Sequence, residues 1–240
     1  MKSDEKTNEE KEHYEEHPYP NSCIMSKKQL QKYRWVFNVL PKPIERGSKI
    51  LDAGCGTGEL SCFLSGYGAV VGMDFSKNAI KLANALKERL KIKNVSFVAG
   101  DITGTSRRGK YDYVFSIGVL HHIPKVDEAV ESLKSCMAEG GFLVVSVYDR
   151  HSMPSFLFWS RFFKKTFTET EIADRFHNPY RVFYTKEQMA ELMRSHGLKI
   201  IKTWRNMPKA IRMITGINPM MTFCCKKDGS DGHVSAGRTR

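Results

Sequence analysis

Residues 49–76 read KILDAGCGTGELSCFLSGYGAVVGMDFS, and this stretch decides the fold. Apolar runs at 49–53 and 70–73 flank a glycine-dense turn at 54–58. Between the turn and the second run, apolar residues recur at three- and four-residue spacing: Leu60, Phe63, Leu64 and Tyr67. That spacing is typical of a helix with one buried face. The stretch therefore predicts a strand, a glycine turn, a helix and a second strand.

This order of elements is a βαβ crossover, and its glycine turn predicts a ligand site. The turn after the first strand lies at the carboxyl edge, where open α/β sheets bind ligands. Glycines let the backbone turn sharply and let a ligand approach main-chain atoms. Asp74 ends the second strand, 22 residues after Asp52, where its carboxylate is placed to accept hydrogen bonds from a ribose diol. A nucleoside-containing cofactor is the expected ligand.

The spacing of the glycines separates two classes of cofactor. A dinucleotide fingerprint starting at Gly54 requires glycine at position 59, where this chain has Glu59, so a nicotinamide oxidoreductase is disfavoured. The pattern is D-x-G-x-G-x-G, through Asp52, Gly54, Gly56 and Gly58. It resembles motif I of class I S-adenosylmethionine (SAM) dependent methyltransferases. A glycine-rich turn without a ligand is the structural alternative.

Two further strand ends extend this resemblance. A strand at 95–98 leads to Gly100-Asp101-Ile102, and a strand at 111–117 leads to Gly118-Val119-Leu120-His121-His122. The second segment resembles motif IV of the methyltransferase type 11 group and of the quinone-biosynthesis C-methyltransferases. The resemblance implies that SAM is the cofactor. It implies these contacts: Asp52, Gly54, Gly56 and Gly58 at the methionine end, Asp74 at the ribose, Phe75, Asp101 and Ile102 at the adenine, and Ser116 and Ile117 beside the sulfonium.

The paired histidines are candidates for acid–base chemistry. Adjacent side chains of an extended segment point in opposite directions, so one histidine is expected to pack and the other to face the cleft. His121 is the candidate general base or polar wall, and a packing role is the alternative. No Cys or Asp cluster stands nearby in the sequence, so a zinc site is not expected.

The rest of the chain completes a Rossmann-like α/β sheet. Strands expected at 142–148 and 198–204 alternate with helices at 125–139, which Gly140-Gly141 should end, and at 185–195, where Thr185 and Gln188 form a capping box. In the resembled fold, 220–225 is an antiparallel seventh strand. The prediction is a mostly parallel seven-stranded sheet with an antiparallel last strand and helices on both faces.

Domain boundaries follow from composition. Residues 1–13 are highly charged and are expected to form a disordered tail, and 226–240 a flexible one. The methyltransferase-like domain then spans 14–225. In the resembled family an amino-terminal helix often covers the cofactor cleft, so the 14–45 segment, with a helix capped by Ser26, is an expected lid. Tyr33 and Trp35 are its candidate lid residues, and packing of both against the sheet is the alternative.

An aromatic-rich segment at 149–184 interrupts the alternation of strands and helices. In the resembled fold, an insertion at this place helps to build the acceptor pocket. Trp159, Phe162 and Tyr180 are the candidate acceptor contacts, with packing in the core as the alternative. Aromatic lining favours an acceptor with an apolar or planar part.

Net charge and cysteine content limit the kinds of partner that the chain can have. The chain of 240 residues carries a formal net charge of +12, and residues 150–240 contain 17 Lys and Arg against 7 Asp and Glu. This basic C-terminal half is a candidate site for RNA or a lipid head group, with a solvated surface as the plainer reading. The six cysteines form no C-x-x-C pair, and no apolar run is long enough to cross a membrane. A soluble, cytoplasmic protein is expected.

The leading hypothesis is an enzyme that moves a methyl group from SAM to an O, N or C atom of a small molecule. The fourth strand ends in Ser116-Ile117-Gly118-Val119 and lacks the [DN]-P-P-[YFW] motif of enzymes that methylate exocyclic base amines. A tRNA or lipid-linked acceptor is the next reading. The alternative from a different functional class is a non-catalytic, methyltransferase-like subunit that acts through interactions.

Overall fold

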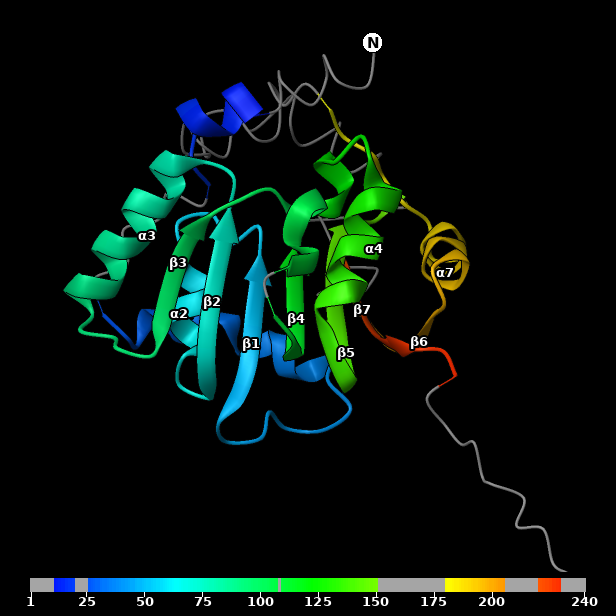
Figure 1. Cartoon of the computed structure of the whole chain (residues 1–240), viewed down its shortest axis with the longest axis horizontal. Helices are drawn as coiled ribbons and strands as arrows, with labels where there is room; N and C mark the ends of the chain where they lie inside the picture. The colour runs from blue at the N-terminus through cyan, green and yellow to red at the C-terminus, as the bar shows by residue number, and fades with distance from the viewer. Residues whose placement is uncertain (1–10, 20–25, 108, 151–179, 206–219, 230–240) are drawn as a thin grey trace, which may run out of the picture.

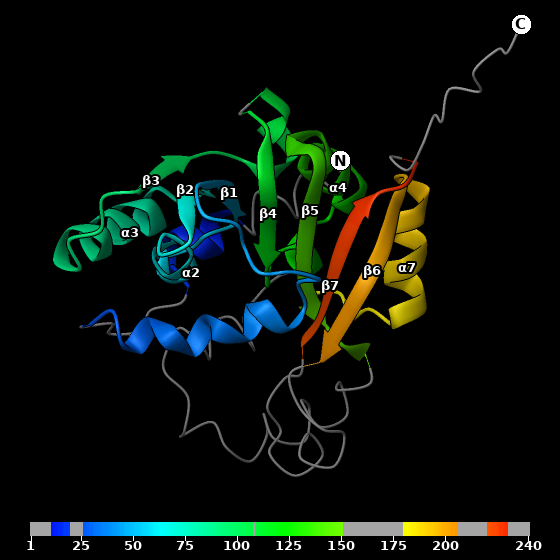
Figure 2. The ribbon, with the colours of Figure 1, turned by 90° about the horizontal axis from the view of Figure 1, so that it is seen from below.

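A seven-stranded sheet forms the centre of the computed structural model, which describes residues 11–19, 26–107, 109–150, 180–205 and 220–229. The strand order is β3-β2-β1-β4-β5-β7-β6 (Figure 1). The pairs among β1 to β5 are parallel, whereas β7 is antiparallel to both β5 and β6. Figure 2 shows β7 between β5 and β6. The predicted fold class is confirmed.

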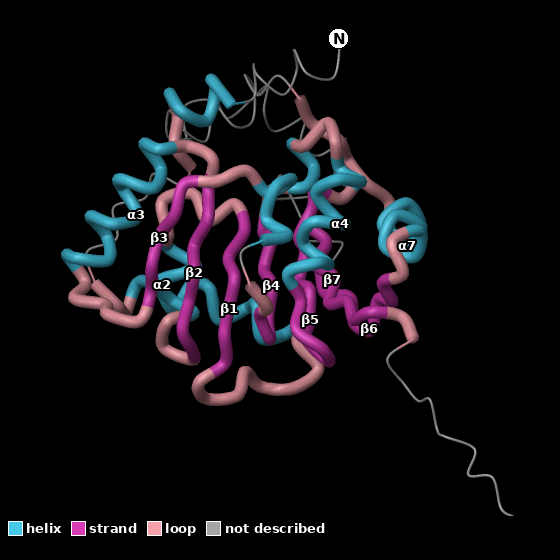
Figure 3. The backbone as a smooth tube through the Cα atoms, viewed as in Figure 1, coloured by secondary structure: helices cyan, strands magenta, loops and turns pink. Residues whose placement is uncertain are grey.

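The elements alternate along the chain as the hydrophobic pattern predicts. The strands are β1 Ser48–Ala53, β2 Gly68–Asp74, β3 Val95–Ala99, β4 Tyr111–Ile117, β5 Met137–Tyr148, β6 Leu198–Arg205 and β7 Met220–Lys227. The α-helices are α2 Glu59–Leu64, α3 Lys77–Arg89, α4 Val126–Cys136 and α7 Lys186–Ser195. The 3₁₀ segments are η1 Gln29–Asn38, η2 Ile102–Arg107 and η3 Leu120–His122. Figure 3 shows these helices around the strands.

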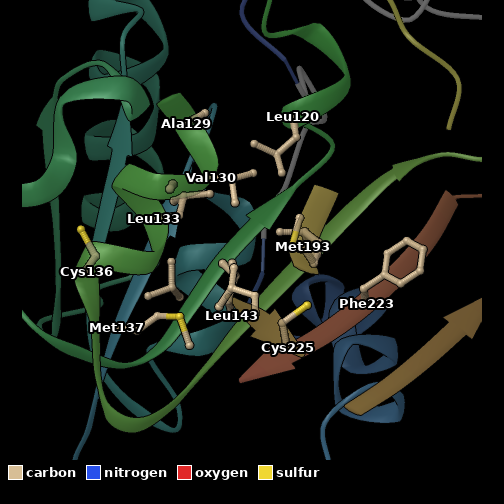
Figure 4. Packing of buried hydrophobic residues seen from close by; sticks show 14 of the residues in the cluster. Leu120, Ala129, Val130, Leu133, Cys136, Met137, Leu143, Met193, Phe223 and Cys225 are labelled. Carbon is tan, nitrogen blue, oxygen red and sulfur yellow. The ribbon is translucent and has the colours of Figure 1, made fainter. Parts of the chain in front are cut away.

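Each face of the sheet has its own hydrophobic core. One core joins α4 and α7 to β4, β5 and β7, and Figure 4 shows Leu133, Leu143, Met193 and Phe223 within it. The other core joins η1, α2 and α3 to the opposite face. Burial of apolar side chains on both faces stabilises the sheet and holds its carboxyl edge in place.

Two of the predicted helix starts are confirmed and one is wrong. The Ser76 hydroxyl accepts a hydrogen bond from Ala79 N, and Thr185 forms a capping box with Gln188. Ser26 caps no helix by its side chain, because η1 begins at Gln29. Instead, the Ser26 hydroxyl and backbone N–H both contact the Gln29 side-chain oxygen.

The helix expected at 125–139 is shorter than predicted. Helix α4 ends at Cys136, and β5 begins at Met137. Tyr111 pairs with Met137 and Tyr113 with Phe142, so the intervening β5 residues form a bulge. Glycine at 141 suits this bulge, because a Cβ there would lie 3.0–3.1 Å from three carbonyl oxygens.

The described chain extends past both expected tail boundaries. Residues 11–16 form a helix, so the part of the disordered tail expected at 11–13 is ordered. Strand β7 extends to Lys227, two residues beyond the predicted end of the domain at 225. Contacts with the carboxyl edge stabilise helix 11–16, and charge composition alone carries no information about such contacts.

The core beneath β7 gives a stability prediction. Phe223 is fully buried, and Phe223→Ala is expected to lower the free energy of unfolding by about 3 to 5 kcal/mol, because it leaves a cavity. Leu82 is 43% exposed, so Leu82→Ala is the control. It is expected to change the free energy of unfolding by less than about 1 kcal/mol. Urea unfolding measures both. Equal losses in the two variants would contradict the placement of β7 in the core.

Candidate functional site

The glycine turn after β1 is tied to the end of β2. Gly54 N and Cys55 N both donate to the Met73 carbonyl oxygen, at 2.7 and 2.9 Å. Gly56 N donates to Asp74 Oδ2 at 2.8 Å. The turn and the strand-ending carboxylate therefore form one hydrogen-bonded unit at the carboxyl edge of the sheet.

The glycines at 54 and 58 are required by both conformation and space. Their φ angles are +80° and +79°, in the left-handed region that favours glycine. A Cβ at Gly54 would lie 2.3 Å from Val119 Cγ2, and one at Gly58 would lie 2.5 Å from Phe97 Cζ. Gly56 also has a positive φ, of 51°. The turn thus brings backbone atoms close to the loop after β4.

Asp74 is positioned to bind a diol. Its Oδ2 accepts from Gly56 N, and its Oδ1 accepts from Ser76 N at 3.0 Å. Burial raises its pKa, although these backbone hydrogen bonds oppose the shift. A carboxylate oxygen has two lone pairs, so each oxygen can accept one further hydrogen bond. This pair of acceptor oxygens fits the two hydroxyls of a ribose.

Asp52 lies beneath the turn, facing α2. Its side chain is 1% exposed, and its Oδ2 accepts a hydrogen bond from Ser61 Oγ at 2.6 Å. Burial raises the pKa of Asp52 to about 7, and the Ser61 hydrogen bond opposes that rise. Asp52 thus connects the end of β1 to α2 and lies next to the predicted methionine end of the site.

Asp101 and Ile102 follow β3 at the same edge. Asp101 Oδ1 accepts from Thr103 N and Thr103 Oγ1, and its Oδ2 pairs with Lys11 Nζ at 2.8 Å. Burial acts to raise the pKa of Asp101, but the hydrogen bonds from Lys11 and Thr103 outweigh it and lower the pKa. Ile102 is 8% exposed and packs in the core.

The helix at 11–16 covers this edge, above the strand ends (Figure 1). The Tyr14 ring contacts Phe75 edge-on, with centroids 6.2 Å apart, and contacts the His122 ring at 5.7 Å. Asn78 Nδ2 donates to the Glu15 carbonyl oxygen at 3.0 Å. Sequence reasoning did not assign Tyr14 to the site, and its only signal was an aromatic residue within a charged segment.

Tyr33 and Trp35, the expected lid residues, are engaged by the body of the fold. The Tyr33 hydroxyl donates to Glu59 Oε2 at 2.8 Å, at the start of α2. Trp35 stacks on Trp204 of β6, with ring centroids 5.3 Å apart. The contacts over Phe75 therefore come from the helix at 11–16 and not from these two residues.

Buried polar atoms gather after β4. Ser116 Oγ and both ring nitrogens of His121 are buried and have no hydrogen-bond partner among the described residues. Burial lowers the pKa of His121 well below its usual value, so its ring is neutral. Ile117, beside Ser116, ends β4. The two polar side chains flank the loop that approaches the glycine turn through Val119.

The acceptor side is described in part. Trp159 and Phe162 lie outside the described residues. The Tyr180 carbonyl oxygen lies 3.1 Å from His122 Nδ1, and Val182 N donates to the His121 carbonyl oxygen at 2.9 Å. The segment 180–184 therefore lies along η3, next to the end of β5.

Two kinds of feature are absent from the described ranges. Those ranges hold no group of three or more His, Cys, Asp or Glu residues arranged to bind a metal ion. They also hold no helix with the length and apolar character needed to cross a bilayer. The anionic partner predicted for the basic C-terminal half stays a prediction, since much of that half lies outside the described residues.

A family model and a curated relative each match half of the chain or more. A family model described as a methyltransferase domain matches residues 44–211. The ubiquinone biosynthesis O-methyltransferase of Thiobacillus denitrificans (strain ATCC 25259 / T1) is 31% identical over 123 residues, 50% of this chain and 52% of that protein. The chain therefore spans about half the length of this curated relative.

Two solved structures share the fold. A SAM-dependent methyltransferase from Anabaena variabilis ATCC 29413 aligns with a TM-score of 0.66 at 17% identity, covering 92% of this chain and 94% of that one. Magnesium protoporphyrin IX methyltransferase from Synechocystis PCC 6803, with bound SAH, aligns with a TM-score of 0.61 at 19% identity, covering 84% and 83%.

The raised pKa of Asp52 predicts a pH-dependent stability. The folded state favours the protonated carboxyl, so this stabilising contribution is complete below the usual pKa of 3.8 and is lost as pH rises through about 7. Asp52→Asn keeps an acceptor for Ser61 and cannot ionise. The free energy of unfolding of Asp52→Asn minus that of the unsubstituted chain should therefore increase by about 3 kcal/mol between pH 4 and pH 8, because only the unsubstituted chain loses stability.

Urea titrations at several pH values measure this difference. The exposed Asp228 provides the matched control, Asp228→Asn, in the same titrations. An Asp52→Asn curve that runs parallel to the unsubstituted curve would show that Asp52 ionises as an ordinary carboxyl.

Proposed function

This chain belongs to the methyltransferase domain family, and from that premise we propose that it transfers the methyl group of SAM to a ring hydroxyl of a small planar acceptor. The observation that carries the proposal is the hydrogen-bonded unit of the glycine turn and Asp74. It offers a carboxylate that can accept hydrogen bonds from a diol and a turn whose glycines carry no Cβ, and both features suit a nucleoside at the carboxyl edge.

The residues of this edge fit SAM in the order predicted from the sequence. Asp74 would hold the ribose hydroxyls, Phe75 would pack on the adenine, and Asp101 with Ile102 would contact its polar edge. The glycine turn, with Asp52 beneath it, would face the methionine end. Ser116 and Ile117 would lie beside the sulfonium, where the buried Ser116 hydroxyl has no partner among the described residues.

Methyl transfer demands little covalent chemistry from the protein. SAM supplies a methyl group on a positively charged sulfur, which is already a good leaving group. The chain's own residues would hold the acceptor in line and exclude water, and such positioning can contribute several kcal/mol to catalysis. Helix 11–16 covers the carboxyl edge and would exclude water from it.

The acceptor side supports a planar substrate. Tyr148 at the end of β5 stacks on Phe183, with ring centroids 5.5 Å apart, and contacts the His122 ring edge-on at 5.7 Å. Tyr14 contacts the same histidine from helix 11–16. Rings arranged in this way favour a flat, partly apolar molecule. Tyr180, whose carbonyl oxygen contacts His122, is proposed to border this space, as are Trp159 and Phe162.

The names of the relatives favour oxygen as the methylated atom. The Thiobacillus denitrificans protein, 31% identical over half of this chain, is named an O-methyltransferase of ubiquinone biosynthesis. The match covers about half of each protein, so the name does not by itself identify the acceptor. We therefore propose a hydroxylated aromatic compound as the acceptor class, without a particular quinone precursor.

The proposed ribose contact is tested by Asp74→Asn. The amide offers one acceptor oxygen in place of two, and its NH₂ group faces a backbone N–H, so SAM affinity should fall by about 1 to 3 kcal/mol. Calorimetry measures the dissociation constants. Asp228→Asn serves as the control and should bind SAM as the unsubstituted chain does. Equal affinity for SAM in both variants would remove Asp74 from the site.

The acceptor class is tested with methyl-labelled SAM. Purified protein is incubated with phenols and catechols, with total RNA and with a lipid extract, and the label in each fraction is counted. Label in the phenolic products, located on oxygen by mass spectrometry, is the expected result. Label confined to RNA or lipid would overturn the proposed acceptor, and tight NADH binding without SAM binding would overturn the proposed cofactor.

A further inference from the structure

The segment 11–19 contacts the proposed cofactor edge at both of its ends. At the first end, Lys11 Nζ pairs with Asp101 Oδ2 at 2.8 Å. At the other end, the Tyr19 carbonyl oxygen accepts a hydrogen bond from Thr57 N, in the glycine turn, at 3.3 Å. Residues of the chain itself therefore contact the proposed adenine carboxylate and the turn at the proposed methionine end.

The hydrogen bonds of Asp101 leave one of its oxygens for a ligand. Its Oδ1 accepts from Thr103 N at 2.9 Å and from Thr103 Oγ1 at 2.8 Å. A carboxylate offers about four lone-pair sites, two on each oxygen, so these two bonds fill Oδ1. A further donor must therefore bind at Oδ2, and this is the oxygen that Lys11 contacts.

Asp101 lies next to the proposed ribose contact. Strands β2 and β3 are parallel, with Asp74 opposite Ala99. Gly100 N donates to the Asp74 carbonyl oxygen at 2.8 Å, which holds the start of the loop that carries Asp101. The two carboxylates thus follow neighbouring strands at one edge, a placement that suits a single nucleoside in contact with both.

The ion pair of Lys11 can open while helix 11–16 stays in place. The side chains of Lys11 and Asp101 are 42% and 36% exposed, so water can solvate the ammonium group once it leaves the carboxylate. The helix keeps other attachments. Asn78 Nδ2 donates to the Glu15 carbonyl oxygen, and the Tyr14 ring contacts Phe75.

We propose that Lys11 competes with the adenine amino group of the cofactor for Asp101 Oδ2, and that Lys11 thereby lowers the affinity of this site for SAM. The inference rests on the proposed function, in which Asp101 contacts the adenine. On binding, the amino group takes the place of the ammonium group at Oδ2, and Lys11 moves into water. Lys11 therefore sets cofactor affinity. A lid residue that closed onto the cofactor would have the opposite effect, because its loss would weaken binding.

The binding test compares two ligands by calorimetry: S-adenosylhomocysteine (SAH), and its 6-deamino analogue, in which hydrogen replaces the adenine amino group. Lys11→Met keeps an apolar stem and removes the charge. It should raise SAH affinity by about two- to five-fold, because one partly exposed ion pair no longer has to break. Affinity for the analogue should not change, since that ligand has no amino group to compete for Oδ2.

Lys81→Met is the matched control. Lys81 is exposed on α3, so this variant also removes one positive charge and leaves the Asp101 contacts intact. It should bind both ligands as the unsubstituted chain does. An unchanged or lowered SAH affinity in Lys11→Met overturns the inference and leaves the proposed function standing, as does an equal gain for both ligands. If the unsubstituted chain binds neither SAM nor SAH, the proposed function and the inference fall together.

A second test needs no cofactor. Burial raises the pKa of Asp101, but the hydrogen bonds from Lys11 and Thr103 outweigh it and lower the pKa. Lys11→Met should therefore raise the pKa of Asp101, and Lys81→Met should leave it in place. Carboxyl ¹³C resonances followed against pH measure it, with the Asp101 signal identified by its absence from Asp101→Asn. The same pKa in Lys11→Met and in the unsubstituted chain would show that the ion pair does not form in solution, and this result overturns the inference.

Discussion

The structure depends on a short set of hydrogen bonds between the end of β2 and the turn after β1. Met73 accepts from two consecutive backbone N–H groups of the turn, and Asp74 accepts from a third. These bonds require the left-handed backbone that Gly54 adopts, and they place the turn against Val119 of the loop after β4. Because β1 is hydrogen-bonded to both β2 and β4, one turn sets the relative position of three strand ends. A substitution that moved it would displace the edge on which the proposed cofactor contacts lie.

The two halves of the site come from different parts of the chain and meet through aromatic rings. The proposed cofactor side is built from β1, β2, β3 and the end of β4, within a continuous stretch of sequence. The proposed acceptor side is built from η3, the end of β5 and 180–184. Tyr14 contacts both sides, through Phe75 and His122. Since Lys11 also pairs with Asp101, helix 11–16 has one charged and one aromatic attachment to the edge. Helix 11–16 therefore contacts residues of both proposed parts of the site.

The sheet could be predicted because the sequence patterns that specify its strands and helices lie within short segments of the chain. The glycine turn, the caps at Ser76 and Thr185 and the apolar runs each involve residues within a few positions of one another, and strand β4 was placed at its observed limits. The features that were missed depend on distant partners. The early start of β5 depends on a bulge opposite β4, and the order at 11–16 depends on strand ends more than sixty residues away. The contact of His122 with the Tyr180 carbonyl oxygen joins residues 58 positions apart, and no local pattern encodes it.

The buried polar groups at this edge destabilise the fold, and their position indicates a role in function. An unpartnered buried polar atom destabilises a fold by about 1 to 3 kcal/mol, and Ser116 and His121 both carry such atoms within the described residues. Asp52 adds a carboxyl whose pKa burial raises to about 7. Asp52 and Ser116 lie near the carboxyl ends of β1 and β4, and His121 lies in η3, just after β4. The sheet's two cores, in contrast, are lined by apolar side chains. Apolar residues at these three positions would relieve the destabilisation, so their concentration at one edge indicates that polar atoms are needed there. A charged sulfur and an ionisable hydroxyl are partners that would use them.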